Sequence, residues 1–343
     1  MEPRTRIILR TVLRVSLGLL VAFVITGMGA RATHPSQMTA GTSPNRLLVQ
    51  RAGQLALLDP DGQNERTVTF DTRKFILDGP CALSPDGTHI AVLLGLFNDE
   101  GRWRLYVRKP GEKGNGTDLE VGCESIHWSP DGTQLVCQGF PDEAPGKWLL
   151  NVPEETFLVD IGTKKRTPLK FPKGHLITDW SQDGQYFLTM KIDKDIDRPN
   201  SQIYLINRDG TEHKAVTDGK QFALDGVLSP DGKQVLYAEI QIKDEKPQPI
   251  QKLFVIETAT GKAAPVEDVP LNGFVLSHCW SPDGKRIAYI WRQVLEGDPD
   301  EIREKEAEAH LVVCDPNGKN LKTVLSEKGK GPNHTRLINL SWR

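Results

Sequence analysis

Residues 278–291 read HCWSPDGKRIAYIW, a stretch in which an apolar segment ends at Trp280, a Ser-Pro-Asp-Gly turn follows, and a second apolar segment begins at Ile287. In such a turn Pro presets φ, Asp accepts hydrogen bonds from nearby backbone amides, and Gly tolerates a positive φ. Two apolar segments separated by a tight turn are typical of a β-hairpin. The stretch therefore predicts a pair of antiparallel strands.

The same turn occurs five times. The copies are LSPDG at 83–87, WSPDG at 128–132, WSQDG at 180–184, LSPDG at 228–232 and WSPDG at 280–284. Their starting residues are separated by 45, 52, 48 and 52 residues. The segments predicted as strands after the turns are 89–94, 134–137, 186–190, 234–240 and 286–291. A period of this length predicts an architecture built from repeats.

A second hairpin accompanies each of the first. The clear copies are 55–69, 203–217 and 311–325, and the looser ones are 104–114, 157–169 and 253–266. Each consists of a strand, a turn that contains Gly, and another strand. Six second hairpins thus accompany five complete first hairpins.

This mismatch predicts how the fold closes. Residues 46–50 form a strand with no hairpin partner before it, and residues 336–342 form a strand with none after it. Pairing the two would complete a sixth sheet and protect strand edges that would otherwise be exposed. We therefore expect an all-β fold over 46–343, a six-bladed β-propeller of four-stranded antiparallel blades. Its ring would be closed by pairing the C-terminal strand with the N-terminal blade, and the folded unit would be complete.

The N-terminus carries a targeting signal. Four arginines (Arg4, Arg6, Arg10 and Arg14) precede an apolar run at 15–30, and ARA at 30–32 offers a small-x-small cleavage pattern. These features predict a secretory signal peptide at 1–32, followed by a linker at 33–45. The alternative is an uncleaved anchor in which residues 7–30 tether the protein to the inner membrane, although the apolar run is shorter than the roughly 20 residues of a spanning helix. Both interpretations predict an exported protein with a periplasmic or other extracytoplasmic location.

The Trp-Ser-Pro-Asp-Gly-x-x-Ile-Ala turn, followed by the second hairpin, resembles the WD40-like (PD40) repeat of the TolB-type β-propeller family. The resemblance covers roughly residues 45–343, with Gln182 in place of Pro in one copy and Leu83 and Leu228 in place of Trp in two others. It implies a propeller fold and a periplasmic compartment. TolB-type proteins also have an N-terminal α/β domain, for which residues 33–45 leave no room, so the family's role in the outer-membrane Tol–Pal system is not transferred. A fold does not by itself imply a function.

Composition and motifs narrow the function classes. The net charge is −2 with both signs scattered along the chain, so nucleic acid is not expected as a partner. No G-x-S-x-G motif and no hydrolase domain accompany the repeats, which argues against peptidases of the prolyl-oligopeptidase type. No catalytic residue and no cofactor are predicted, and a non-enzymatic protein is favoured.

The repeated aspartates are interpreted as turn residues. They are Asp86, Asp131, Asp183, Asp231 and Asp283. Each blade needs its turn, and Asp at this position serves the turn's hydrogen bonds.

Histidines and cysteines are the remaining candidates for chemistry. The resemblance extends to metal-dependent polysaccharide lyases. The weak metal candidates are His127, His175 and His278, which lie on or just before the strands that would line the channel. Scattered structural histidines are favoured, and no metal site is predicted.

Cys123 and Cys137 flank one turn almost symmetrically. They are expected either to form a disulfide in an oxidising compartment or, as we favour, to be small buried hydrophobes.

Long connections gather on one face of the predicted ring. They are 140–155, 193–202, 243–252 and 293–309. Binding residues commonly lie on long loops of a rigid scaffold. Within the last connection, Asp298 as N-cap and Pro299 in the first turn predict a short acidic helix at 299–309, either a solvated decoration or a docking element for a basic partner.

Two short segments on the same face resemble each other, RKFILDG at 73–79 and KQFALDG at 220–226. They place Asp78 and Asp225 near the channel mouth, beside Arg73 and Lys220, and these four residues are the predicted ligand site.

The sequence therefore favours an exported, non-enzymatic binding or scaffold protein that engages a protein or cell-envelope component through the long-loop face. Contact with a membrane would be only through an uncleaved N-terminal segment. The alternative is a carbohydrate-active enzyme, a polysaccharide lyase or hydrolase, with its site at the channel mouth.

Overall fold

The structure is a computed structural model and describes residues 45–51, 54–70, 75–77, 79–96, 103–139, 155–192, 200–241, 250–295, 305–330 and 337–343. Every regular element in these ranges is a β-strand. No helix long and apolar enough to cross a membrane occurs in the described residues. The predicted all-β fold, built from four-stranded antiparallel sheets, is confirmed.

The strands form five hydrogen-bonded sheets. The first contains, in spatial order, β25 (Ile338–Trp342), β1 (Leu47–Arg51), β2 (Gln54–Leu58) and β3 (Arg66–Val68). The second contains β4 (Phe75–Ile76) and β5 (Cys81–Leu83), both paired with β6 (Ile90–Leu96), then β7 (Trp103–Arg108) and β8 (Thr117–Asp118). The third contains β9 (Ser125–Trp128), β10 (Gln134–Gly139), β11 (Glu155–Asp160) and β12 (Arg166–Pro168).

The fourth sheet has eight strands in two halves. One half contains β13 (His175–Trp180), β14 (Tyr186–Ile192), β15 (Ser201–Asn207) and β16 (His213–Ala215). The other contains β17 (Phe222–Leu228), β18 (Gln234–Gln241), β19 (Ile250–Glu257) and β20 (Ala263–Pro265). A single parallel pair, Ser201 with Phe222, joins the halves. The fifth sheet contains β21 (Gly273–Trp280), β22 (Ile287–Gln293), β23 (Glu306–Cys314) and β24 (Lys322–Lys330).

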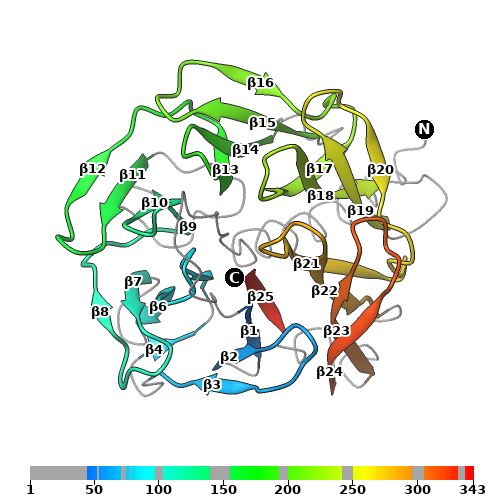
Figure 1. Ribbon diagram of the computed structural model, residues 1–343, viewed down its shortest axis with the longest axis horizontal. Coiled ribbons are helices and arrows are strands. Elements are labelled where there is room, and N and C mark those ends of the chain that lie inside the picture. Colours follow the sequence, from blue (N-terminus) through cyan, green and yellow to red (C-terminus); the bar gives the residue numbers. More distant parts are fainter. Residues whose placement is uncertain are drawn as a thin grey trace, which may run out of the picture.

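The sheets are arranged around a common centre (Figure 1). Strands β9, β13, β17, β21 and β25 lie nearest the centre, whereas β3, β8, β12, β16 and β20 lie on the rim. Each inner strand contacts the next one: β5 with β9, β9 with β13, β13 with β17, β17 with β21, β21 with β25, and β25 with β5. The inner strands therefore bring residues from distant parts of the sequence to one axis.

The last strand pairs with the first. In the β1–β25 pair, Leu47 lies opposite Trp342 and Leu48 opposite Ser341. The backbones of Arg46 and Arg343 bond to each other in both directions, and the indole Nε1 of Trp342 donates to Asn45 Oδ1 at 2.5 Å. The two ends of the described chain thus share one sheet.

The five repeated turns have the hydrogen-bond network expected of them. At 229–234, Ser229 Oγ donates to Asp231 Oδ1 at 2.7 Å, and the backbone N–H of Lys233 donates to the same oxygen at 3.1 Å. The N–H of Gln234 donates in turn to Ser229 Oγ at 2.9 Å. The other copies, centred on Asp86, Asp131, Asp183 and Asp283, make the same bonds. The interpretation of these aspartates as turn residues is confirmed.

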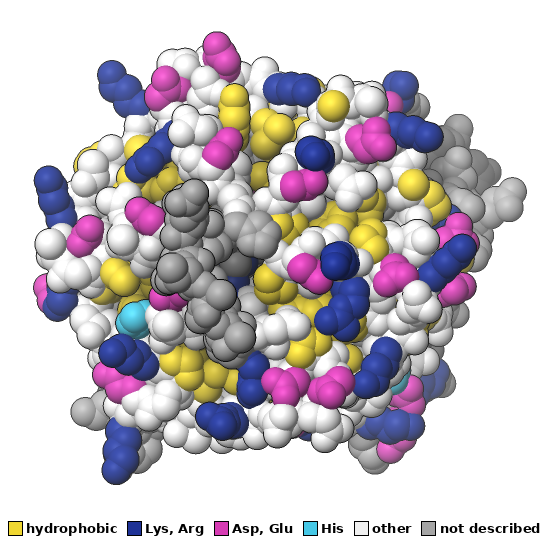
Figure 2. Space-filling view, in the orientation of Figure 1, with side chains coloured by type: hydrophobic (Ala, Val, Ile, Leu, Met, Phe, Trp, Pro, Cys, Tyr) yellow, Lys and Arg dark blue, Asp and Glu magenta, His cyan; other side chains and the backbone are white. Residues whose placement is uncertain are grey.

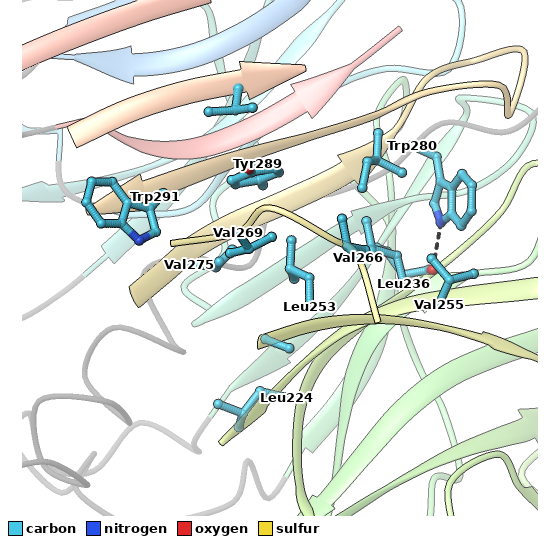
Figure 3. Packing of buried hydrophobic residues seen from close by; sticks show 14 of the residues in the cluster. Leu224, Leu236, Leu253, Val255, Val266, Val269, Val275, Trp280, Tyr289 and Trp291 are labelled. Atoms are coloured by element: carbon cyan, nitrogen blue, oxygen red, sulfur yellow. Dashed lines mark hydrogen bonds between the residues drawn. The ribbon is translucent and has the colours of Figure 1, made fainter. Parts of the chain in front are cut away.

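Apolar clusters fill the spaces between neighbouring sheets. The largest of them joins β17–β20 to β21–β24, and Figure 3 shows Leu236, Leu253 and Val275 packed between the two groups of strands. At its edge Trp280, buried at 1% exposure, donates its indole N–H to Val227 O on the preceding inner strand at 3.2 Å. The equivalent Trp128 bonds to Ala82 O at the same distance. Trp128 and Trp280 therefore each bond one inner strand to the preceding one, whereas the indole N–H of Trp180, at the same position, has no hydrogen-bond partner.

The predicted helix at 299–309 is wrong over 306–309, where β23 begins; residues 296–304 lie outside the described ranges. Residues 306–309 alternate Glu-Ala-Glu-Ala, and this period of two buries Ala307 and Ala309 while the glutamates face outward. Glu308 then pairs across the strands with Lys328 on β24 at 2.6 Å. Sheet pairing thus prevails over the predicted helix at 306–309.

Candidate functional site

Irregular pairing marks the inner strands. β13 shifts register between Ile177 and Asp179, β17 between Leu224 and Val227, and β21 between Val275 and Ser277. A further shift separates β1 from β25 at Val49 and Gln50. Bulges of this kind redirect side chains and are common next to functional sites.

Asp225 is the most unusual residue in these bulges. Its φ is +49°, in the left-handed region that non-Gly residues adopt rarely and at a cost of order 1–3 kcal/mol. Its Oδ1 is buried and lacks a hydrogen-bond partner, and the side chain forms no hydrogen bond or ion pair with any residue that the structure describes. The fold therefore holds a carboxyl group on strained backbone with one buried oxygen that no donor reaches.

The Asp-Gly sequence explains the local backbone. Gly226 packs closely on the neighbouring half-sheet, where an added Cβ would lie 3.0 Å from both Ile203 Cδ1 and Leu188 Cδ2. Ser201 Oγ donates to Ala223 O on the same side, beside the single pair that joins the halves. The absence of a side chain at Gly226 lets β17 approach β14 and β15, and the bulge leaves Asp225 as the extra residue opposite β18.

Burial raises the pKa of the Asp225 carboxyl to about 7, far above its usual value near 4. The carboxyl group thus titrates near neutral pH.

The bulge on β25 provides a comparison. Asn339 also has a positive φ, +52°, but its Nδ2 donates to Gln50 Oε1 at 2.8 Å and to Gly79 O at 3.0 Å. An amide can therefore occupy an inner-strand bulge of this kind and bond to the protein. In both residues Oδ1 is buried without a donor, but an ionised Asp225 has no N–H of its own with which to bond to the protein.

A second carboxyl group lies toward the same end of the inner strands. Glu124 directly precedes β9, at the end opposite the Ser-Pro-Asp-Gly turn, and burial raises its pKa to about 7. Glu124 was not singled out in the sequence, although a charged residue immediately before an apolar inner strand was a signal that could have found it. Perturbed carboxyl groups on a rigid scaffold are a common mark of a functional site.

The structure describes two of the four residues of the predicted ligand site, Lys220 and Asp225. Arg73 and Asp78 lie outside the described residues. Lys220 is 78% exposed, and its Nζ lies 3.1 Å from Asp218 Oδ2. Of the two described residues, Asp225 has a buried carboxyl oxygen and Lys220 is exposed.

The three candidate histidines lie on three different inner strands, β9, β13 and β21. His127 is 1% exposed, and burial lowers its pKa to about 4. His175 bonds through Nδ1 to Thr189 Oγ1 at 3.0 Å, and burial, with Lys191 and His213, lowers its pKa to about 4. His278 is buried opposite Tyr289. Across the described ranges, no group of three or more His, Cys, Asp or Glu side chains is arranged to hold a metal ion.

Comparison with known proteins identifies the fold. No family model matches the chain. The chain is 25% identical over 134 residues to a TolB homolog of Chlorobium luteolum, a match that covers 39% of this chain and 26% of the relative, so only about a quarter of that relative is spanned. The crystal structure of TolB from Acinetobacter baumannii matches with a TM-score of 0.60 at 19% identity, over 88% of this chain and 67% of that one.

A putative TolB from Agrobacterium tumefaciens matches with a TM-score of 0.58 at 16% identity, over 88% of this chain and 98% of that one. The described strands have the fold of a TolB-like β-propeller. The resemblance inferred from the repeated turns is confirmed. At these identities the solved structures establish the fold, and function has to be argued from the site.

Proposed function

We propose that this protein is an exported, non-enzymatic binding or scaffold protein that engages a protein or cell-envelope component through the long-loop face of its propeller. The observation that carries the proposal is Asp225, a strained and unsatisfied carboxylate on an inner strand. The export signal at 1–32 and the periplasmic location that the family resemblance implies belong to the same proposal.

The scaffold in this proposal is a closed ring of six four-stranded blades. Two observations support it. The eight-stranded sheet divides into two four-stranded halves joined by one residue pair, and β25 pairs with β1 within one sheet. A closed ring holds its inner strands rigidly. A rigid binding site loses little conformational entropy when a ligand binds.

The cost of Asp225 to the fold is the reason to assign it to binding. Left-handed strain, a buried oxygen without a donor and a raised pKa all reduce stability, and Asn339 shows how an amide at such a bulge bonds to the protein. A residue that lowers the stability of the folded state without supporting the fold is commonly retained because it has a function. The missing partner would then come from the ligand.

The chemistry of that ligand follows from the acceptor. A carboxylate in a poorly solvated position binds hydrogen-bond donors and cations, such as backbone N–H groups or an ammonium of a partner protein. The surface favours no single charge: on the face shown in Figure 2, basic and acidic side chains are interspersed around the rim, and hydrophobic side chains gather in patches nearer the centre. Apolar patches with a few buried polar anchors are typical of protein-binding surfaces.

The test is quantitative capture from a cell-envelope extract with the wild-type chain and two variants. Asp225→Asn removes the charge at the site, and Asp209→Asn makes the same change in an exposed turn between β15 and β16. We expect one near-stoichiometric protein to bind wild type and Asp209→Asn, and to bind Asp225→Asn at least about tenfold more weakly, since hydrogen bonds to charged groups contribute about 1.5–3 kcal/mol. Equal binding to all three proteins would remove Asp225 from the interface. Stabilisation by an acidic oligosaccharide with no protein captured would instead favour the carbohydrate-active alternative.

The same substitution should stabilise the free protein. Because the pKa of Asp225 is raised to about 7, the folded state loses stability as the pH rises from about 4 to 7 and the carboxyl ionises. We expect Asp225→Asn to raise the free energy of unfolding by about 1–3 kcal/mol at pH 8, with little gain at pH 4. Urea unfolding at both pH values measures this.

Asp231→Asn is the matched comparison. Although burial tends to raise the pKa of Asp231, the bonds from Ser229 and the Lys233 backbone outweigh that effect and lower it. Its replacement should destabilise the protein at pH 8 by about 1 kcal/mol. If both asparagine variants were destabilised alike at pH 8, Asp225 would be an ordinary structural residue.

A further inference from the structure

Cys123 and Cys137 approach each other at the open end of the β9–β10 hairpin. Cys137 lies opposite Ile126, and the backbone N–H of Glu124 donates to Gln138 O at 2.8 Å, which carries the pairing one step beyond β9. A Cβ placed on Gly139 would lie 3.3 Å from Cys123 Cα. The missing side chain at Gly139 therefore lets the backbone at Cys123 pack directly on the end of β10.

Both side chains lie in the same apolar cluster, at 5% and 0% exposure. Both thiols are reduced in the structure. Burial, together with the neighbouring Cys137 thiol, raises the pKa of Cys123 well above its usual value. Since a thiolate is the attacking species, Cys123 is unreactive once the sheets have packed around it.

The other three cysteines belong to other apolar clusters. Cys81, Cys279 and Cys314 are buried in three different clusters, none of which contains Cys123 or Cys137. Of the five cysteines, the structure brings together the two that flank one repeated turn.

We propose that Cys123 and Cys137 form an intramolecular disulfide when the chain folds in the presence of a disulfide oxidant, such as oxidised glutathione or the oxidised form of a dithiol protein. The thiolate of one cysteine attacks the oxidant's disulfide, forms a mixed disulfide and releases one thiol. The second cysteine then displaces the other half of the oxidant. The two cysteines lose two electrons and two protons, and the oxidant leaves as two thiols.

Burial sets the timing of this reaction. The exchange has to occur before the sheets that cover the pair close over it, since an oxidant cannot reach sulfurs that are 5% and 0% exposed. The same burial would then protect the bridge from reductants in the folded protein. The bridge closes a loop of 15 residues, counted from 123 to 137, around the turn at 128–132. For a loop of this size we expect the melting temperature to rise by about 5 °C.

The experiment is a thiol count on the full chain, unfolded with reductant and then refolded in a mixture of reduced and oxidised glutathione. Folded protein is denatured without reductant, alkylated and analysed by mass spectrometry. We expect three alkylated cysteines (Cys81, Cys279 and Cys314) and a linked pair of peptides that contain Cys123 and Cys137. The control Cys314→Ala should retain the bridge and show two alkylated cysteines, whereas Cys123→Ala should show four.

The melting temperature provides a second measurement. Wild type refolded with glutathione should melt about 5 °C above wild type refolded in reductant alone, and the double variant Cys123→Ala/Cys137→Ala should melt alike under both conditions. The same thiol count on protein isolated in its folded state from an oxidising compartment, with thiols blocked at lysis, does not depend on refolding. Five alkylated cysteines in both preparations, or a bridge to any other cysteine, would overturn the proposal. None of these outcomes depends on Asp225 or on a partner.

Discussion

Replacement of Trp342 by alanine is expected to lower the free energy of unfolding by about 3–5 kcal/mol, because a fully buried Trp leaves a cavity that the structure fills only in part. Trp342 is 0% exposed and lies opposite Leu47 in the pair between the last and first strands. Its indole N–H also bonds to Asn45, and the Arg286 guanidinium lies 5.1 Å from its ring centroid. One side chain thus supports the joint between the two ends of the chain.

Urea unfolding followed by far-UV circular dichroism measures this effect, since the substitution removes a fluorophore. The matched control is Leu321→Ala, which removes a large apolar side chain that is 42% exposed and should change stability by about 0.5 kcal/mol or less. Deletion of β25 should go further and prevent cooperative folding, because the edge of β1 would be left unpaired. A Trp342 variant as stable as the Leu321 control would mean that β25 does not hold the sheet together.

Acidification from pH 6.5 to pH 4 should destabilise the protein through His127. Burial lowers the pKa of this histidine from 6.5 to about 4. The unfolded chain therefore takes up a proton in this range and the folded chain does not, so stability is complete above pH 6.5 and falls as the pH approaches 4. The shift corresponds to about 3 kcal/mol for this one residue.

Comparing His127→Gln with wild type isolates the contribution of His127 to the pH dependence of stability. In the whole protein, other titratable groups partly cancel this contribution. His175 has the same sign as His127, whereas the raised pKa values of Asp225 and Glu124 lower stability as the pH rises toward 7. His127→Gln should therefore lose about 2–3 kcal/mol less than wild type between pH 7.5 and pH 4.

Val136→Ala serves as the control, since Val136 lies opposite His127 and carries no titratable group. Its cost should be equal at both pH values. Parallel pH curves for wild type and His127→Gln would show that this histidine is not held neutral by the fold.

The predictions about the fold succeeded where they rested on repeated local chemistry. Ser229, Asp231 and Gly232 specify their turn through contacts within six residues, and the alternating apolar residues after it specify a strand. The helix predicted at 299–309 is wrong over 306–309, and the signal for it was also local. The alternation of Glu306 to Ala309 pairs with strands on both sides, and that pairing is a tertiary contact.

The candidate site shows the same division. The repeated Phe-x-Leu-Asp-Gly pattern was enough to single out Asp225, but its left-handed φ, its buried Oδ1 and its raised pKa arise from packing against strands brought there by the fold. Lys220 was expected beside Asp225. Its exposed side chain instead forms an ion pair with Asp218.

The sequence by itself determined the strands, the turns, the number of repeats and the resemblance to TolB-type propellers, because each of these depends on residues close together in the chain. Only the tertiary structure decided which polar groups lose their water. Glu124, His127 and Asp225 owe their shifted pKa values to desolvation by neighbouring strands. Desolvation depends on everything that surrounds a group, and most of those surroundings come from distant parts of the sequence.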